Sequence, residues 1–317
     1  MKGLFRKFAG AALCALLAAG ALAAGGCSGY RSVEQAVSDV SLQPAVGAGA
    51  TIEQGVLTVG LNASNPPYSW PDDYSTVAGK LQGVDVDVAL ALGEELGLTV
   101  RFVDVSSAHG AAAAGTCDVV MGESSATIPT SEVVAGNYLE YAPALFARNA
   151  SGTVAAEQLL SGTVGVQAGT STQHVLQTSF PTAAVTTFDN LNEAFSALES
   201  GAVDYVACDS FMGGYLANVQ YADISFVGSL ELPGSRGVSV GASNSELNSA
   251  VKAALDTLLA DGTMASIRQR WVGSMPVADA SNVVAAPVAE EPSEEDSGEW
   301  EDSGEWADSG EWEESEG

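Results

Sequence analysis

The 317-residue sequence predicts an α/β fold with mainly parallel sheets. Short β-rich runs alternate along it with amphipathic segments of helical spacing, which is typical of strands joined by helices. Hydrophobic residues make up 46% of the chain, enough for a sizeable core. Segment 197–210 repeats the scheme of segment 111–124: helix end, Gly, Asp, apolar strand, acidic residue, Ser. This repeat predicts two similar lobes.

The first half of the chain opens with a β-rich run, VLTVGLN, at 56–62. A loop with three prolines follows, and then a helix is expected from Val84 to Leu96, where apolar residues recur at helical spacing and Gly97 ends the pattern. The remaining elements expected here are a strand at 98–105, a short helix at 107–114 and a buried strand at 118–123.

The second half continues the alternation of strand and helix. Its β-rich runs are TVGVQAG, AAVTTF and VDYVACD, each followed by a segment with helical spacing. The strands expected here lie at 163–169, 183–188 and 203–209, and the helices at 170–178, 191–200, 211–219, 246–259 and 262–271.

The charge balance excludes several partners. The chain has 40 acidic and 11 basic residues and a net charge of −29. Nucleic-acid binding needs a basic surface, so we expect no nucleic-acid partner. Docking through basic residues onto anionic lipid is disfavoured for the same reason. Part of the acid lies in residues 290–317, which hold 14 Asp and Glu and no Lys or Arg, but the rest of the chain is acidic as well.

The N-terminus has the pattern of an export signal. Three basic residues precede an apolar stretch that ends in Gly25 and Gly26, followed by Cys27. The pattern resembles a bacterial lipoprotein signal, although Ala24 stands where that family prefers Leu. The resemblance implies a signal peptide at 1–26 and lipidation of Cys27, which would anchor the chain to the cell membrane from outside the cytoplasm. The alternative is an ordinary cleaved signal with an incidental cysteine.

The regions that flank the expected domain have the composition of linkers: residues 28–52 are mostly small or polar, and residues 276–295 contain Pro276, Pro287 and Pro292. We expect residues 27–52 to be a linker behind the lipid anchor and residues 275–317 to be a second linker with an acidic tail. DSGEW occurs three times in that tail, and its six-residue period fits neither helix nor strand, so disorder is expected. The tail either solvates the protein or presents its tryptophans to a partner or a cell-wall polymer.

Five segments between Leu57 and Gly273 resemble the solute-binding proteins of ABC importers, in the polar amino-acid group (family 3, with the type 2 periplasmic binding fold). The segments are VLTVGLNASNPPYSW, GKLQGVDVDVALALGEELGL, GTCDVVMGESSAT, LSGTVGVQAGTSTQ and DGTMASIRQRWVG. Each segment alone is a weak signal, but their order and spacing together are specific.

The resemblance implies two α/β lobes joined by a two-strand hinge. Lobe 1 would comprise residues 53–145 and 235–274, and lobe 2 residues 146–234. The chain would leave lobe 1 near 143–148 and return near 230–236. A small solute would bind between the lobes and close them. The partners implied are this solute, an amino acid or amine, and an ABC permease in the membrane, with the protein a monomer.

The family site is carried over by position. The first-lobe residues are Asn62, Asn65, Tyr68, Gly122, Glu123, Ser124, Ser125 and Thr130. The second-lobe residues are Gln167, Thr170, Ser171 and Asp209. In the family, the loop after the DVVM strand holds the α-amino group of the ligand.

Several of these residues have a second interpretation. Asp209 resembles the family aspartate that pairs with the ligand ammonium, and it is also placed to cap a helix. Tyr68 or Trp70 would stack on the ligand, or Tyr68 simply packs. We expect Asp85 and Asp87 to be structural and Trp271 to lie in the core. The opening of the helix after Gly169 favours an anion.

The pattern departs from the family at its carboxylate-binding arginine. No Lys or Arg occurs between Arg101 and Arg148, and Thr130 or Glu132 stands at the matching position. We therefore expect a cleft without a fixed cation but with the acidic Glu123 and Asp209. Because a buried carboxylate without a countercharge is costly, we expect a ligand that is net neutral or positive.

The remaining chemistry is sparse. In the implied fold Cys117 and Cys208 fall in different lobes, so we expect two free, buried thiols. His109 and His174 each lie in an expected helix, and no Cys or His cluster suggests a metal. No cofactor is expected, and the sequence lacks the GxSxG, HExxH and P-loop patterns of enzymes. The prediction is therefore a solute-binding protein, with a surface sensor or interaction protein and a dehydratase-type enzyme as alternatives.

Overall fold

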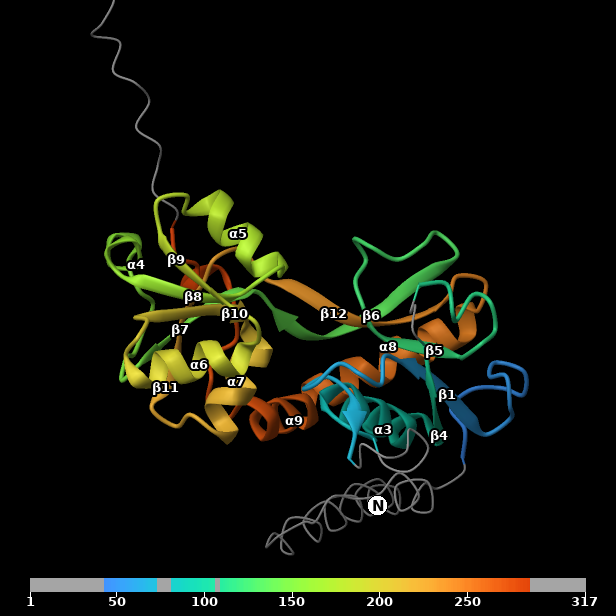
Figure 1. Cartoon of the computed structure of the whole chain (residues 1–317). Helices are drawn as coiled ribbons and strands as arrows, with labels where there is room; N and C mark the ends of the chain where they lie inside the picture. Colours follow the sequence, from blue (N-terminus) through green and yellow to red (C-terminus); the bar gives the residue numbers. More distant parts are fainter. Residues whose placement is uncertain (1–42, 73–80, 106–108, 286–317) are drawn as a thin grey trace, which may run out of the picture. The chain divides into compact units, whose positions relative to one another are not determined.

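The computed structural model describes residues 43–72, 81–105 and 109–285. Within these residues the chain forms two five-stranded sheets and a two-stranded ribbon (Figure 1). The order of the first sheet is β4-β1-β5-β12-β6, and that of the second is β11-β7-β10-β8-β9. The predicted α/β fold class is confirmed. The signal peptide, Cys27 and the acidic repeats lie outside the described residues.

The first sheet is parallel on one side and antiparallel on the other. β1 (Val56–Leu61) pairs in parallel with β4 (Thr99–Asp104) and with β5 (Val119–Glu123). β12 (Gly234–Gly241) then pairs antiparallel with β5 and with β6 (Glu132–Tyr141). The carboxyl ends of β1 and β5 therefore lie at the same edge, and the loops that follow them carry Asn62–Tyr68 and Ser124–Thr130.

The second sheet repeats this plan. β8 (Thr163–Gln167) pairs in parallel with β9 (Ala184–Phe188) and with β10 (Tyr205–Asp209). β7 (Pro143–Arg148) pairs antiparallel with β10 and with β11 (Ile224–Ser229). The sequence repeat noted above therefore corresponds to β5 and β10, the third strand of each sheet. Each ends in an acidic residue, Glu123 or Asp209.

The chain passes twice between the sheets through short connections. It leaves the first sheet at the end of β6 and enters β7 after one residue, Ala142. It returns between Ser229, where β11 ends, and Gly234, where β12 begins. The segment 143–148, where we expected the outward crossing, is already a strand of the second sheet.

The helices follow the sequence closely. α3 (Val84–Leu96) buries most of its apolar residues and ends at Gly97, which has a positive φ of 64°. The other helices are α4 (Ala156–Ser161), α5 (Ser171–Ser179), α6 (Leu191–Ser200), α7 (Ser210–Val219), α8 (Ser245–Ala260) and α9 (Thr263–Val272). The ribbon consists of β2 (Trp70–Pro71) and β3 (Leu81–Gln82), and a short 3₁₀ turn, η1, spans Ala280–Asn282.

Two parts of the secondary structure differ from the sequence analysis. The strands β6, β11 and β12 and the short α4 were not expected. The helix expected at 107–114 is wrong for its described part, because residues 109–115 form turns. His109 therefore lies in a turn, whereas His174 lies in α5 as expected. The expected core position of Trp271 is confirmed, because its side chain is buried.

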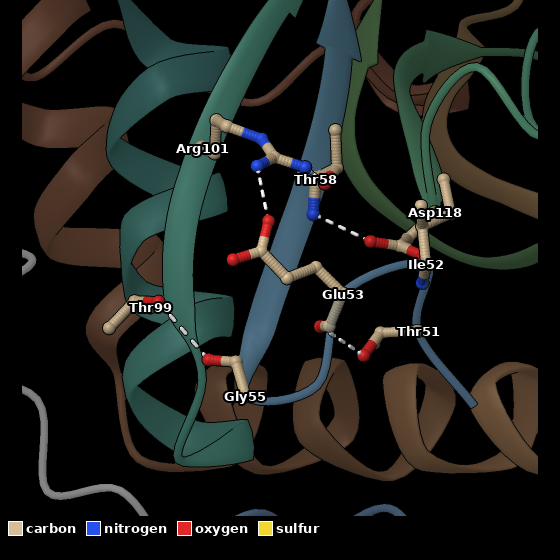
Figure 2. Close-up of polar contacts among 8 residues, drawn as sticks. All are labelled: Thr51, Ile52, Glu53, Gly55, Thr58, Thr99, Arg101 and Asp118. Carbon is tan, nitrogen blue, oxygen red and sulfur yellow. Dashed lines mark hydrogen bonds and ion pairs between the residues drawn. The ribbon is translucent and has the colours of Figure 1, made fainter. Parts of the chain in front are cut away.

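Residues 43–52, expected to belong to a linker, pack against the first sheet instead. Val46 and Ala50 are buried, and their neighbours are tied to the domain by backbone hydrogen bonds. The carboxylate of Asp118 accepts the N–H of Ile52 at 2.7 Å and that of Thr58 at 2.7 Å, which joins this segment to β1 (Figure 2). The small residues that suggested a linker allow this close packing.

The same corner of the sheet holds a surface ion pair. Arg101 of β4 binds the Glu53 carboxylate at 2.5 Å and donates to the Thr58 hydroxyl at 2.8 Å (Figure 2). Thr99 donates to the carbonyl of Gly55 at 3.1 Å. Both charged groups of the pair are half exposed, so its contribution to stability is about 0–1 kcal/mol.

Residues 275–285, also expected to be linker, form a strap between the end of α9 and β11. Arg268 donates to the carbonyls of Met275 and Pro276 at 2.6 and 2.8 Å. Val283 then pairs with Ser229 in an isolated parallel bridge, and the buried Val284 donates its N–H to the Ser229 carbonyl at 2.8 Å. The strap gives the chain a third connection to the second sheet.

The remaining features concern the thiols and the membrane. The prediction of two free, buried thiols is confirmed for Cys117 and Cys208. Burial raises the pKa of Cys117 to about 12, so its thiol is protonated at neutral pH. In the described part of the chain, no helix combines the length and apolar character needed to span a bilayer.

Candidate functional site

Tyr68 and Asp209 carry the contact that joins the two sheets at the predicted site. The Tyr68 hydroxyl, from the loop after β1, donates to Oδ1 of Asp209, at the end of β10, at 2.9 Å. The same oxygen accepts the N–H groups of Phe211 and Met212, each at 2.9 Å, so Asp209 also caps α7. The predicted role of Asp209 as a helix cap is thus observed. Its carboxylate also faces the other sheet, which is compatible with the second prediction, that it pairs with the ligand ammonium.

Burial sets the protonation behaviour of this pair. Desolvation raises the pKa of Asp209 above its ordinary value, and the N–H of Met212, the Tyr68 hydroxyl and Arg236 oppose that shift. Desolvation and the neighbouring Asp209 carboxylate raise the pKa of Tyr68, so the phenol stays protonated and donates. The contact is therefore a neutral donor on a carboxylate.

Arg236 also belongs to this group, although the sequence patterns did not predict it there. Its guanidinium carbon lies 3.9 Å from the centre of the Tyr68 ring, and its Nη2 binds Oδ2 of Asp85 at 2.8 Å. The expectation of a site without a fixed cation is therefore wrong. That expectation rested on the lack of Lys or Arg between Arg101 and Arg148 and on Gln167 at the matching position of the second lobe, whereas Arg236 comes from β12, far along the chain. A signal was present, because Arg236 is the only Lys or Arg between Arg148 and Lys252.

The charge of Arg236 is balanced by Asp85. Tyr138 of β6 donates to Oδ1 of Asp85 at 2.6 Å, while Arg236 takes Oδ2, so both carboxylate oxygens are used. Burial is the largest influence and disfavours the charged guanidinium, but Asp85, Tyr138 and Tyr68 together keep the pKa of Arg236 above its ordinary value. The expected structural role of Asp85 is confirmed, as is that of Asp87, which accepts the indole N–H of Trp271 at 2.9 Å.

Gly122 lets Arg236 approach the loop after β5. Its φ is +84°, and a Cβ there would lie 2.2 Å from Nη2 of Arg236. Only glycine combines this backbone conformation with space for the guanidinium. One donor of the guanidinium, Nε, is buried and has no acceptor among the described residues.

Glu123 is paired with a histidine. Its side chain is 3% exposed, and its Oε2 lies 3.0 Å from Nδ1 of His109, which is 54% exposed. Burial raises the pKa of Glu123, and the His109 ring opposes that shift. Glu123 is therefore held at the end of β5 by a partner of its own.

Other predicted residues make local contacts. Asn62 accepts the N–H of Ser64 at 3.0 Å, and Ser124 accepts that of Ala126 at 3.3 Å. Gln167 donates to the Asp189 carbonyl at 3.3 Å. Thr170 caps α5 by accepting the N–H of Gln173. Asn65 makes backbone bonds with Tyr68 and Ser69, and Ser125, Thr130 and Ser171 are exposed.

Two further candidates do not face an open site. Glu132 is buried, and its carboxylate accepts the N–H groups of Ala112 and Ala113 at 2.8 and 3.1 Å and the hydroxyl of Ser239 at 3.2 Å. Trp70 is buried against Trp271, with ring centres 5.5 Å apart. Neither side chain is available to a solute in this arrangement.

The predicted site residues therefore form one compact group and several separate ones. The compact group consists of Tyr68, Gly122 and Asp209 around Arg236. The predicted residues at the start of α5 and in the loop after β5 make separate, local contacts. A cavity of about 320 Å³ lies elsewhere, between α7, β11 and the strap, and none of the predicted residues lines it. The compact group is thus the best candidate for solute contact.

This group has an excess of negative charge. Asp85 and Arg236 neutralise one another, which leaves Asp209 and, at the end of the neighbouring strand, Glu123 with its histidine partner. No group of three or more His, Cys, Asp or Glu that would suit a metal ion occurs within residues 43–72, 81–105 and 109–285. Chemically, the arrangement offers a hydrogen-bonded carboxylate beside aromatic rings.

Relatives share the sequence over most of the domain. The L-cystine-binding protein TcyJ of Escherichia coli (strain K12) is 25% identical over 232 residues, 70% of this chain and 84% of that protein. The ABC transporter glutamine-binding protein GlnH of Bacillus subtilis (strain 168) is 25% identical over 208 residues, 63% of this chain and 76% of that protein.

Solved structures share the fold. The Ancestral Cationic Amino Acid Solute Binding Protein (AncCDT-1) is 28% identical with a TM-score of 0.58, covering 69% of this chain and 96% of that one. The L-cystine solute receptor of Neisseria gonorrhoeae, in an unliganded open conformation, has a TM-score of 0.59 at 22% identity, covering 69% of this chain and 93% of that one.

The family model described as bacterial extracellular solute-binding proteins, family 3, matches residues 57–274. This range begins within β1, ends just after α9 and includes the compact group around Arg236. The chain belongs to this family of extracellular solute-binding proteins.

Proposed function

We propose that this protein captures an amino acid or a related small polar or cationic solute between two lobes and delivers it to an ABC permease. The lobes comprise residues 53–145 with 235–274 and residues 146–234. The observation that carries the proposal is the Asp209 carboxylate at the end of β10, which faces Tyr68 of the other sheet at 2.9 Å. A carboxylate in this position pairs with an ammonium group.

The charge of the compact group supports the choice of solute. Because Asp85 pairs with Arg236, the charge of this arginine is already balanced and is not available for a second carboxylate of the solute. An ammonium, in contrast, gains a charge-assisted bond from Asp209 and is favoured near the Tyr68 and Phe211 rings. We propose a ligand that is net neutral or positive. The names of relatives that bind cystine, glutamine or cationic amino acids agree with this class.

A thermal-shift panel on the full chain tests the proposal. The solutes are L-arginine, L-lysine, L-cystine, L-glutamine, L-glutamate and galactose. Ligand at 100 times its dissociation constant stabilises the native state by about 2.7 kcal/mol, which raises the melting temperature measurably. We expect shifts with the neutral or cationic amino acids, a weaker shift with L-glutamate and none with galactose.

Two results would count against this function. The tightest binding to L-glutamate would contradict the proposed ligand charge. The absence of a shift with every solute would contradict solute capture and favour a sensor or interaction role.

We also propose that lipidated Cys27 anchors the protein outside the cytoplasm. The support is the basic and apolar sequence that precedes Cys27 and the extracellular family of the domain. We expect the variant Cys27→Ser to move from the membrane fraction to the soluble fraction of the cell. An unchanged membrane fraction would contradict the anchor.

A further inference from the structure

The Asp209 carboxylate is used unevenly. Its Oδ1 atom accepts three hydrogen bonds, from Tyr68, Phe211 and Met212, each at 2.9 Å. None of the described residues donates to Oδ2, and Asp209 as a residue is only partly buried. One oxygen is therefore fixed in place, and the other is available as an acceptor.

The three donors to Oδ1 differ in origin. Phe211 and Met212 belong to the first turn of α7, so their N–H groups stay beside Asp209 wherever the helix goes. Tyr68 comes from the loop after β1, on the other sheet, 141 residues away. The Tyr68 bond therefore exists only when the two sheets hold this arrangement.

The Tyr68 side chain is itself held firmly. It is buried, its ring lies beneath the Arg236 guanidinium at 3.9 Å, and it stacks on Phe211 with ring centres 5.5 Å apart. Its backbone carbonyl accepts the N–H of Asp85 at 3.0 Å. Arg236 in turn binds Asp85 at 2.8 Å. The hydroxyl is thus aimed at Asp209 by contacts on several sides.

We infer that Tyr68 is a positioning residue for the solute ammonium: its hydroxyl, arriving with the first lobe, holds Oδ1 of Asp209 so that Oδ2 faces the ligand. The inference rests on the proposed function, since it concerns the same site. A carboxylate whose rotation is fixed before the ligand arrives loses less conformational freedom on binding. Preference for a donor such as an ammonium follows, because Oδ2 of an ionised carboxylate accepts hydrogen bonds and donates none.

The hydrogen bond from Tyr68 also affects the ionisation of Asp209. A hydrogen bond donated to a carboxylate favours the ionised form, and the Tyr68 hydroxyl opposes the upward pKa shift that burial causes at Asp209. The other titratable groups around the contact are Arg236, Asp85 and Cys208. The hydrogen bond from Tyr68 therefore favours the ionised form of Asp209, which is the form that pairs with a cation.

The test is the pH dependence of binding in the variant Tyr68→Phe, measured calorimetrically on the full chain with L-arginine and L-glutamine. Loss of one hydrogen bond predicts about three- to tenfold weaker binding at pH 7. Because the bond also lowers the pKa of Asp209, the midpoint of the acid-side loss of binding should move to higher pH.

Tyr221→Phe is the matched control. Tyr221 is a buried tyrosine of the second sheet region, and its hydroxyl contacts Ser196 at 3.1 Å rather than a carboxylate. This variant should lose stability without moving the midpoint. If Tyr68→Phe does not fold, 3-fluorotyrosine at position 68 replaces it. That side chain is a more acidic donor and should move the midpoint to lower pH.

Three outcomes would overturn the inference. Weaker binding in Tyr68→Phe with an unchanged midpoint would mean that Tyr68 is structural only. Unchanged or tighter binding would mean that the hydroxyl does not hold the acceptor for the ligand. Failure of the wild-type chain to bind either amino acid would remove the proposed function itself, and the inference with it.

Discussion

At the scale of single residues, Asp209 combines two roles that a sequence cannot separate. As an N-cap it satisfies the N–H groups of Phe211 and Met212, which have no partner within α7. As a carboxylate facing the other sheet it carries the charge that we propose for ammonium binding. Asn is as good an N-cap as Asp, so substitution by Asn removes the charge and keeps the cap.

The variant Asp209→Asn should therefore bind an ammonium-bearing solute more weakly and melt near the wild-type temperature. Hydrogen bonds to charged groups contribute about 1.5–3 kcal/mol, which predicts about 10- to 100-fold weaker binding of L-arginine by calorimetry. Asp209→Ala is the contrast, because it loses both roles and should also melt lower. Wild-type affinity in Asp209→Asn would exclude Asp209 as the acceptor.

Asp209 also predicts a pH dependence of stability. Burial raises its pKa in the folded protein, so the folded state binds more protons than the unfolded state between the ordinary pKa, about 3.9, and the raised one. The stabilising contribution of Asp209 to the free energy of unfolding is therefore fully present below the ordinary pKa and is lost as pH rises through the raised pKa.

Urea unfolding of the ligand-free chain at several pH values, with Asp209→Asn beside it, checks this sign. The wild-type free energy of unfolding, relative to that of the variant, should fall as pH rises through this window. Burial also raises the pKa of Glu123. Because Glu123 is present in both proteins, the difference between them isolates the contribution of Asp209. A relative rise would contradict the burial argument.

At the scale of elements, the approach of β12 to the end of β5 assembles the site. β12 pairs with β5 and brings Arg236 beside Gly122 and Tyr68. The pairing shifts register between Gly237 and Val238, next to Arg236. The position of Arg236 thus depends on strand pairing between segments more than a hundred residues apart.

The variant Gly122→Ala tests whether Arg236 needs the space beside Gly122. A methyl group would lie 2.2 Å from Nη2 of Arg236, on a backbone with φ +84°. Strain of this backbone and displacement of the guanidinium together predict a loss of about 2–4 kcal/mol in the free energy of unfolding. Denaturant unfolding measures it.

Gly115→Ala is the matched control for Gly122→Ala. Its φ is +72°, but nothing lies within 4 Å of the added methyl group. Only the backbone cost remains, about 1–2 kcal/mol. Equal losses in the two variants would mean that Arg236 does not need the space beside Gly122.

At the scale of the whole described molecule, the strap 275–285 joins α9 to the second sheet. Trp271 and Val272 at the end of α9 belong to the core of the first sheet, and Val284 packs in the core of the second. Together with the passages from β6 to β7 and from β11 to β12, the strap is a third covalent connection between the two cores. A change in their arrangement must also move the strap.

Val284→Ala tests the contribution of the strap. The side chain is buried, so loss of two methyl groups and the cavity left behind predict a destabilisation of about 1.5–2.5 kcal/mol by denaturant unfolding. Val277→Ala, in the same strap but 43% exposed, should change stability by less than about 0.5 kcal/mol. Similar values for both would show that Val284 does not hold the strap.

Much of the fold could be predicted because it follows from local patterns. The apolar spacing and closing glycine of α3 lie within one segment, and so do the runs that form β1, β8 and β10. The repeat that relates β5 to β10 was also visible. The strands β6 and β12 were not found, because their side chains mix exposed and buried positions and their pairing is long-range. The strand β11 was not found either, although five of its six residues are buried.

The site was predictable only in part, for a related reason. Asp209 and Tyr68 follow recognisable strands, so their place at the sheet edges followed from the sequence. Their 2.9 Å contact joins residues 141 positions apart, and it depends on how two sheets meet. Arg236 gave a weak signal as a lone basic residue, but nothing in its segment indicates that it forms an ion pair with Asp85.

The sequence alone thus determined the α/β class, most of the helices, the acidic character and the family resemblance, because periodicity, composition and short patterns are local properties. Only the tertiary structure decided that Arg236 lies over the Tyr68 ring, that Asp85 balances its charge and that Tyr68 reaches Asp209. These facts arise from pairing between distant strands and from burial, which fix the distances between charges and so their energies.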